Sequence, residues 1–266
     1  MRPISQFPEK TAVNITTVFA DIDDTLTIDG RLPAAAYQVL EDLFEAGFNV
    51  APITGRPAGW CDMIARFWPV SGVVGENGAF YFAYDGKAKK MQREYFAPEA
   101  VRLANQQKLN TIKERVLLEV PGCAVSADQA YRDVDMAIDF REDVEPLDHR
   151  AVQKIKQIFE EEGAVAKISS IHVNCWFGDF DKLSMSRQFA RQVLGFDLDR
   201  EKNKVIFCGD SPNDAPMFGF FPNSCGVANV LDFKDQLEAE PAWITIGKGG
   251  KGFVEVASML LQAKNC

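Results

Sequence analysis

The sequence is poor in the residues from which transition-metal and disulfide sites are built. It contains only two histidines among 266 residues, and its cysteines form no Cys-x-x-Cys pair. His149 and His172 lack metal-binding spacing, so we expect both to be structural. Several cysteines lie inside apolar runs such as VIFCGD, which predicts reduced, mostly buried thiols in a cytoplasmic protein. The six are Cys61, Cys123, Cys175, Cys208, Cys225 and Cys266.

Long apolar runs and an excess of positive charge are also missing. No uninterrupted apolar stretch approaches the ~18 residues of a membrane span, and the opening MRPISQFPEKTAVN has no apolar core of signal-peptide length. With 29 basic and 38 acidic residues, the net charge is −9. This charge argues against nucleic acids and anionic membranes as general partners. We therefore expect a soluble protein of the cell interior.

Strand-like and helix-like segments alternate over the first eighty residues. NITTVFAD is β-branched and apolar, as a strand buried on both faces should be. In PAAAYQVLEDLFEAGF, Leu40, Leu43 and Phe44 lie at helical spacing and Gly47 marks the end. NVAPIT and SGVVGENGA are further strands, with the helix PAGWCDMIARFW between them. This alternation predicts an α/β fold with a parallel sheet, covered by helices and joined by right-handed crossovers.

A different pattern interrupts the alternation after Tyr84. The polar break YDGKAKK is followed by neighbouring strands and only two helices, which predicts an inserted α+β domain. The alternating pattern returns at Lys182, with the helix DKLSMSRQFARQVL and the strand KVIFCG. We predict a Rossmann-like, doubly wound core over residues 1–83 plus 181–266, and an inserted cap domain over residues 84–180.

Polar segments follow four predicted strands of the core. They are DIDDT, TGRP and GENGA after the first three strands, and GDSPND after KVIFC. Loops beyond the carboxyl ends of parallel strands converge on one crevice, the usual ligand site. A buried unpaired carboxylate is costly because the charge loses its water. Asp21, Asp23 and Asp24 lie directly after a buried strand, so we expect a divalent cation and a lysine to neutralise them.

In these segments the sequence resembles the haloacid dehalogenase (HAD) superfamily, and within it the Cof-type and sucrose-phosphatase-like phosphatases of subclass IIB. The motif Asp-x-Asp-x-Thr, a threonine after the second strand, a lysine opening a late helix and Gly-Asp-x-x-Asn-Asp all match. Leu183 follows the lysine where the family usually has glycine. The insertion lies where this subclass carries its α/β cap. The matching residues are Asp21, Asp23, Thr25, Thr54, Lys182, Gly209, Asp210, Asn213 and Asp214.

The acidic residues suit phosphoryl transfer through a covalent intermediate. Asp21 is placed to attack phosphorus and form an aspartyl-phosphate. Asp23 can protonate the leaving alcohol and later activate the water that hydrolyses the intermediate. Asp210, Asp21 and a backbone carbonyl near Asp23 offer the hard oxygen ligands that Mg²⁺ prefers. We expect Asp214 to complete the metal site by positioning a metal-bound water or Lys182.

The substrate phosphate needs donors of its own. Thr54 and the backbone N–H groups of Gly55 and Arg56, at the start of a helix, form a natural phosphate cradle. Asn213 is assigned to the same set. Lys182 adds a point charge that can hold both the nucleophile and the transferring phosphoryl group.

Simpler roles for several of these residues stay open. Asp and Thr also suit helix caps and turns, so DIDDT and Thr54 could serve as such. Lys182 could form a surface ion pair with Asp179 or Asp181, which would contribute little to stability. Arg56 could contact substrate or solvent. Glu76 and Asn77 of ENGA could orient Lys182 or the substrate, or merely shape a turn.

The function that these residues predict is a Mg²⁺-dependent phosphatase acting on a small phosphorylated metabolite, a sugar phosphate. A phosphomutase of the same fold and a catalytically inactive regulatory module are the alternatives. The cap is expected to close over the crevice, exclude water and supply substrate-reading side chains from regions near 121–135 and 168–180. The expected partner is a small phosphate ester, with neither nucleic acid nor membrane, and nothing in the sequence indicates an oligomeric state.

Overall fold

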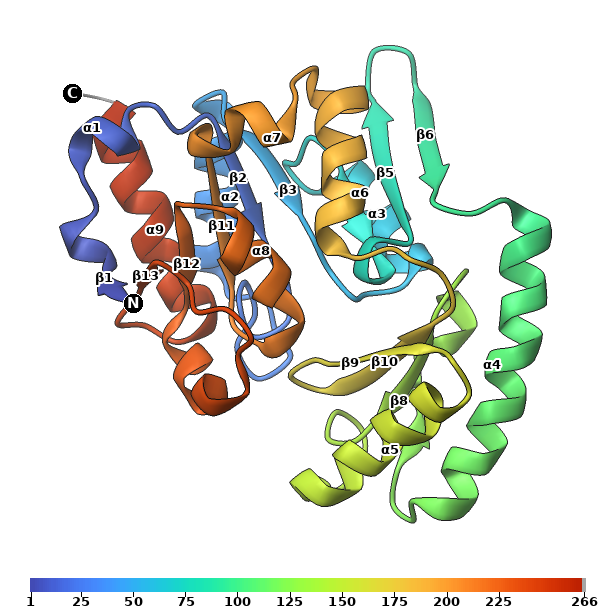
Figure 1. Cartoon of the computed structure of the whole chain (residues 1–266). Coiled ribbons are helices and arrows are strands. Elements are labelled where there is room, and N and C mark those ends of the chain that lie inside the picture. Colours follow the sequence, from blue (N-terminus) through green and yellow to red (C-terminus); the bar gives the residue numbers. More distant parts are fainter. Residues whose placement is uncertain (265–266) are drawn as a thin grey trace.

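A six-stranded parallel sheet forms the centre of the larger domain (Figure 1). The computed structural model describes residues 1–264. The strands lie in the order β1-β13-β12-β11-β2-β3, and each neighbouring pair is parallel. Their bounds are Arg2–Pro3 for β1, Trp243–Ile244 for β13, Ser224–Gly226 for β12, Val205–Gly209 for β11, Thr17–Ala20 for β2 and Asn49–Pro52 for β3.

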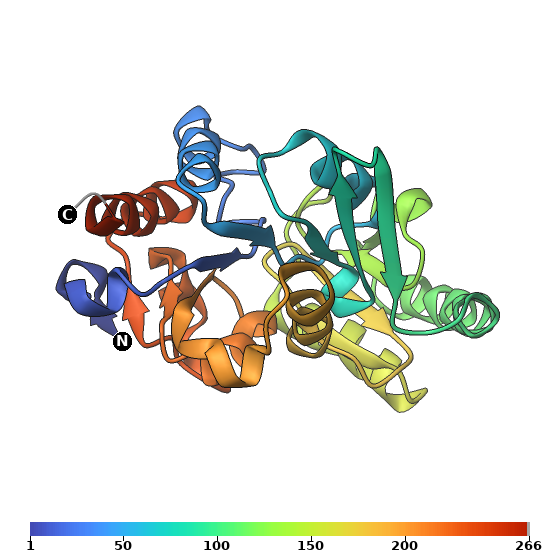
Figure 2. The same cartoon turned by 90° about the horizontal axis from the view of Figure 1, so that it is seen from above.

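Alternate residues of the central strands point into two separate apolar cores. Val18 and Ile206 pack in the core that also contains residues of α2 (Ala34–Glu45) and α9 (Gly249–Lys264). Phe19 and Phe207 pack in the opposite core, with residues of α6 (Lys182–Phe189) and α8 (Ala215–Phe220). Figure 2 shows the blue α2 and red α9 on one side of the sheet and the orange helices on the other. Helices on both faces explain why these strands are apolar throughout.

A second, antiparallel sheet extends the core beyond β3. It contains β4 (Val73–Gly75), β5 (Phe80–Asp85) and β6 (Lys90–Tyr95), and a parallel bridge between Ile53 and Val74 joins it to the end of β3. Helix α3 (Ala58–Phe67) packs against β4 and β5. The segment YDGKAKK, which we expected to be a break, includes the turn of the β5–β6 hairpin.

The inserted domain has one four-stranded antiparallel sheet in the order β7-β8-β10-β9. Helices α4 and α5 pack against it in a third apolar core, and Figure 1 shows β9 and β10 nearest the larger domain. The predicted α/β fold with an α+β insertion is therefore confirmed, whereas the predicted domain limits stay a prediction. The bounds are Ala124–Val125 for β7, Met136–Asp139 for β8, His172–Trp176 for β10, Val165–Ile168 for β9, Glu99–Glu119 for α4 and His149–Glu161 for α5.

The remaining elements are short. Helices α1 (Glu9–Ala12) and α7 (Leu198–Glu201) lie at the periphery, and a π-helical turn over Ala190–Leu194 continues α6. Five cysteines are free thiols in the described part of the chain, and Cys266 lies outside it. Within residues 1–264, no helix combines the length and apolarity that crossing a membrane requires.

Candidate active site

Three of the predicted acidic residues meet at the carboxyl ends of β2 and β11. Carboxylate oxygens of Asp21, Asp210 and Asp214 lie within 4.8 Å of one another, and all three residues are buried. The parallel pairing of β2 with β11 brings together residues almost 190 positions apart in sequence. Gly209 is required at this edge, because a Cβ atom there would lie 2.4 Å from Asp214 Oδ2. The backbone N–H of Asp210 donates to that same oxygen at 3.1 Å.

Lys182 lies between two of these carboxylates. Its Nζ atom donates to Asp21 Oδ1 and to Asp214 Oδ1, both at 2.7 Å. Burial lowers the pKa of Lys182, but the two carboxylates raise it further, so that it lies above its ordinary value. Asp181 does not pair with the lysine; its side chain accepts from Ser184 N and caps α6. The structure thus places Lys182 at the acidic cluster and not in a surface ion pair.

The acidic cluster carries more negative charge than Lys182 neutralises. Burial raises the pKa of Asp21 to about 7, although Lys182 opposes the shift. Burial and the neighbouring carboxylates raise the pKa of Asp210 well above its usual range. Asp210 also accepts from Thr25 Oγ1 at 3.2 Å. Three buried carboxylates around one ammonium group form an oxygen-rich site that fits a hard divalent cation such as Mg²⁺.

Asp23 is not part of this cluster. Its carboxylate is paired with the guanidinium of Arg56. Arg56 Nε donates to Asp23 Oδ2 at 2.9 Å, and Nη2 donates to Oδ1 at 2.8 Å. The same guanidinium donates to Glu142 Oε1 at 2.6 Å and to Asp128 Oδ2 at 3.3 Å, both in the cap. These partners raise the pKa of Arg56 above its ordinary value despite its burial. The Arg56 side chain therefore joins Asp23 to the cap, a contact that we had not expected.

The residues of the expected phosphate cradle lie close together, and some of their polar groups are already paired. The backbone N–H of Arg56 donates to Thr54 Oγ1 at 3.0 Å, and the carbonyl of Gly55 accepts from Arg132 Nη1 at 2.9 Å. Asn213 Nδ2 donates to Asn77 Oδ1 at 3.4 Å. Gly55 and Asn213 thus line the crevice, and Thr54 precedes Gly55 in the chain.

Asn77 adds an unused donor to this group. Its amide Nδ2 is buried and has no hydrogen-bond partner within the described residues. A Cβ atom on Gly55 would lie 3.1 Å from that nitrogen, so the amide faces the phosphate cradle. Buried donors without a partner are rare and costly. Asn77 therefore qualifies as a further ligand for a phosphate oxygen.

Glu76, in the same ENGA segment, ties the cradle to the cap. Its carboxylate accepts from the backbone N–H of Ala58, at the start of α3, at 2.9 Å. It also accepts three backbone N–H groups of the cap, those of Asp133, Val134 and Asp135, at 2.7–3.0 Å. Glu76 is completely buried. It therefore holds the segment that precedes β8 close to the start of α3, after the loop that follows β3.

Cap residues close the crevice above the acidic cluster. Ser170, His172, Asn174 and Arg132 line it together with Asp21. These cap residues fall in the two regions that we expected to face the core. Glu142 lies outside both regions, and its 2.9 Å contact with His172 Nε2 was not anticipated. The signal available was its place just after an apolar strand, which is too common to identify a site.

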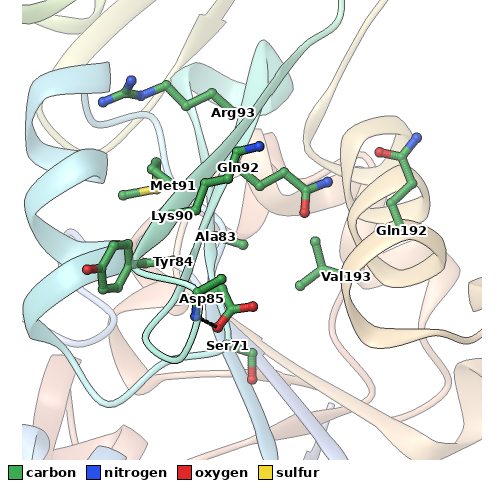
Figure 3. Close-up of a pocket in the computed structure, with 11 residues that line it drawn as sticks. Ser71, Ala83, Tyr84, Asp85, Lys90, Met91, Gln92, Arg93, Gln192 and Val193 are labelled. Atoms are coloured by element: carbon green, nitrogen blue, oxygen red, sulfur yellow. Dashed lines mark hydrogen bonds between the residues drawn. The ribbon is translucent and has the colours of Figure 1, made fainter.

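A larger cavity lies elsewhere. It has a volume of about 630 Å³ and lies between the β5–β6 hairpin and the end of α6, where Gln192 and Val193 face Gln92 (Figure 3). None of the predicted site residues lines it. Predicted site residues line the smaller crevice at the sheet edge instead.

Comparisons with known proteins agree with this geometry. A sequence model described as haloacid dehalogenase-like hydrolase matches residues 18–174. A search of curated protein sequences found no match. Among solved structures, the protein 0175 of Thermoplasma acidophilum is 18% identical with a TM-score of 0.69, covering 92% of this chain and 98% of that one.

Two similar structures are phosphatases. The sucrose-phosphatase of Synechocystis sp. PCC6803 is 14% identical with a TM-score of 0.61, covering 92% of this chain and 97% of its own. The HAD subclass IIB sugar phosphatase BT4131 is 13% identical with a TM-score of 0.61, covering 91% and 98%. At such identities, the likeness shows that the fold is shared, with the cap included.

Proposed function

Because the chain belongs to the haloacid dehalogenase-like hydrolase family, we propose that it is a Mg²⁺-dependent phosphatase acting on a small phosphorylated metabolite, a sugar phosphate. The observation that carries this proposal is the position of Lys182 Nζ, 2.7 Å from Asp21 in a cluster with Asp210 and Asp214. The sugar-phosphate and sucrose-phosphate substrates named for two structural neighbours support the substrate class.

In the proposed reaction, an Asp21 carboxylate oxygen attacks phosphorus while the bond to the leaving oxygen breaks. Asp23, protonated after its pair with Arg56 opens, gives a proton to that oxygen, and the alcohol departs. Asp23 then takes a proton from the water that attacks the aspartyl-phosphate, and the Asp21–phosphorus bond breaks to release phosphate. Lys182 holds Asp21 in position and offsets the charge of the transferring group.

The remaining residues orient the substrate and the metal. A Mg²⁺ ion held by Asp21, Asp210 and Asp214 would supply positive charge that screens the substrate phosphate from the acidic nucleophile. Thr54 and Asn77 provide hydroxyl and amide donors for phosphate oxygens. The cap excludes bulk water from the crevice, which strengthens every one of these electrostatic contacts.

The first prediction concerns the nucleophile. Asp21→Asn should lower phosphate release by roughly 10³-fold or more while phosphate-ester binding persists, because the amide cannot form the covalent intermediate. Release from p-nitrophenyl phosphate and a sugar-phosphate panel measures this, with and without a chelator of divalent ions. Asp42→Asn, the same change on α2, should keep wild-type turnover. Full activity in Asp21→Asn would contradict the mechanism, and phosphorus NMR would separate release of phosphate from transfer to a second hydroxyl.

A location in the cytoplasm and the absence of nucleic-acid and membrane partners belong to the same proposal. The free thiols of the described chain and the net charge of −9 support them.

A further inference from the structure

Two cavities of opposite charge lie beside the crevice above Asp21, and each shares lining residues with it. One has a volume of about 260 Å³, shares Asp23 and Arg56 with the crevice, and is lined by four carboxylates and two guanidinium groups. The other has a volume of about 340 Å³ and shares Asn213 with the crevice. Because the Arg56 guanidinium is already paired with Asp23 and Glu142, the first cavity stays acidic in character. An anion would be repelled from it.

The second cavity, which we call the lysine cavity, is lined by Lys156 and His149 of α5, Lys167 of β9, and Asn213 and Glu238 of the core. It thus lies between cap and core, beside the loop that carries Asp210 and Asp214. Its volume is within the range of small-molecule sites.

The two lysines of this cavity have little local compensation. Lys167 forms no ion pair with any residue of the described chain. Lys156 has only Glu160, at 3.6 Å, and the Glu160 side chain is half exposed. By contrast, Lys154 on the same helix points to Glu119 at 3.2 Å. Glu238 is the one carboxylate among the described residues that line the cavity, so the cationic groups outnumber it.

We propose that the lysine cavity binds a second acidic group of the substrate, a carboxylate or a second phosphate, through Lys156 and Lys167. This inference rests on the proposed phosphatase function and narrows its substrate class. An ammonium group near a protein surface attracts such an anion strongly once the closing cap removes water. Phosphorylated sugar acids and sugar bisphosphates then fit better than neutral sugar monophosphates. The overall charge of −9 makes a local excess of cations necessary for such substrates.

The test compares substrates that differ in one acidic group. Glucose 6-phosphate is the neutral-tail reference, 6-phosphogluconate adds a carboxylate, and glucose 1,6-bisphosphate adds a phosphate. The wild-type kcat/KM should be roughly tenfold or more higher for at least one acidic substrate than for glucose 6-phosphate. Lys167→Gln and Lys156→Gln should each lower that preference several-fold, mainly through KM. Lys154→Gln, the matched change on the same helix, should leave the preference unchanged.

Four results would overturn the inference. Equal kcat/KM for all three substrates, or equal losses on all of them in Lys167→Gln, would show that the cavity does not read a second charge. If p-nitrophenyl phosphate is hydrolysed but acidic substrates are not preferred over glucose 6-phosphate, the phosphatase proposal stands. Only the proposed role of the lysine cavity is then rejected. Absence of turnover on every ester with Mg²⁺ present would reject both.

Discussion

Asp21, Asp210 and Asp214 place three buried carboxylates around one ammonium group, and this imbalance of charge defines the site at the scale of single residues. The motifs Asp-x-Asp-x-Thr and Gly-Asp-x-x-Asn-Asp predict these acids from sequence, because each motif follows an apolar strand. For Asn77 the sequence left the choice open between orienting Lys182 or substrate and shaping a turn, since asparagine is common in turns. Its role follows only from the buried amide that faces Gly55.

A prediction at this scale concerns that amide. Asn77→Ala should weaken inhibition by inorganic phosphate roughly tenfold and raise KM for phosphate esters, because a donor to a phosphate oxygen is lost. Steady-state kinetics with phosphate as inhibitor measures both constants. Asn223→Ala, the removal of a buried amide that bonds backbone carbonyls far from the site, controls for general destabilisation. An unchanged inhibition constant would remove Asn77 from the phosphate site.

At the scale of elements, the turn over Glu76–Gly78 positions the start of α6. Gly78 has a φ of +104°, and a Cβ atom there would lie 2.0 Å from the carbonyl oxygen of Asp181. Only glycine permits this approach without strain. Lys182 follows Asp181 directly in the chain. The turn after β4 therefore helps to fix the position of Lys182 relative to Asp21. This contact explains physically how the ENGA segment can influence the position of Lys182.

Gly78→Ala should therefore affect both stability and catalysis. We expect unfolding to become easier by at least about 1 kcal/mol, since the new methyl group meets backbone and the φ is unfavourable for alanine. We also expect a fall in kcat larger than that in Gly86→Ala, where a Cβ atom would meet no neighbour within 4 Å. Urea unfolding and phosphate release measure the two effects. Equal behaviour of both variants would show that the contact does not position α6.

At the scale of the whole molecule, charged groups hold the cap against the core. Arg56 contacts Glu142 and Asp128 of the cap, and Glu76 accepts three cap N–H groups. His172 supports Glu142 from the cap side. In the proposed function, substrate entry requires this network to open, so its strength would contribute to the equilibrium between open and closed forms.

The cap contact of Glu142 should weaken in acid. Burial raises the pKa of Glu142, but His172 and Arg56 lower it further, to about 2 from an ordinary value of 4.5. A lowered carboxyl pKa stabilises the folded state fully above pH 4.5, and this contribution is lost as the pH falls from 4.5 through 2. The stability difference between wild type and Glu142→Gln should be about 1–3 kcal/mol at pH 5 and shrink towards pH 2.5.

Urea unfolding of the two proteins between pH 5 and pH 2.5 measures this difference. Glu160→Gln, which changes an exposed carboxylate of α5, should show no comparable pH dependence. A difference that stays constant over this range would mean that Glu142 is not ionised against Arg56 and His172.

Much of the architecture could be predicted from periodicity and motif order. The family, the parallel sheet and the α+β insertion are confirmed. Strand β5 was not identified, because its run of aromatic residues follows GENGA without a new alternation. Strand β1 has only two residues, and pairing with β13 creates it. The ion pairs of Arg56 with Asp23 and with Glu142 could not be predicted. They depend on how the cap packs against the core.

The sequence by itself determined which residue types stand at the strand ends, because a buried parallel strand and the loop after it are local patterns. It thereby predicted that Asp21, Asp23, Thr54 and Asp210 lie at one edge of the sheet, whereas Lys182 stayed open between this edge and a surface ion pair. Only the tertiary structure decided which side chains are in contact. Lys182 donates a hydrogen bond to Asp21, whereas Asp23 accepts one from Arg56. Distances between side chains from separate loops are set by packing of cap, turn and sheet, and no local pattern encodes them.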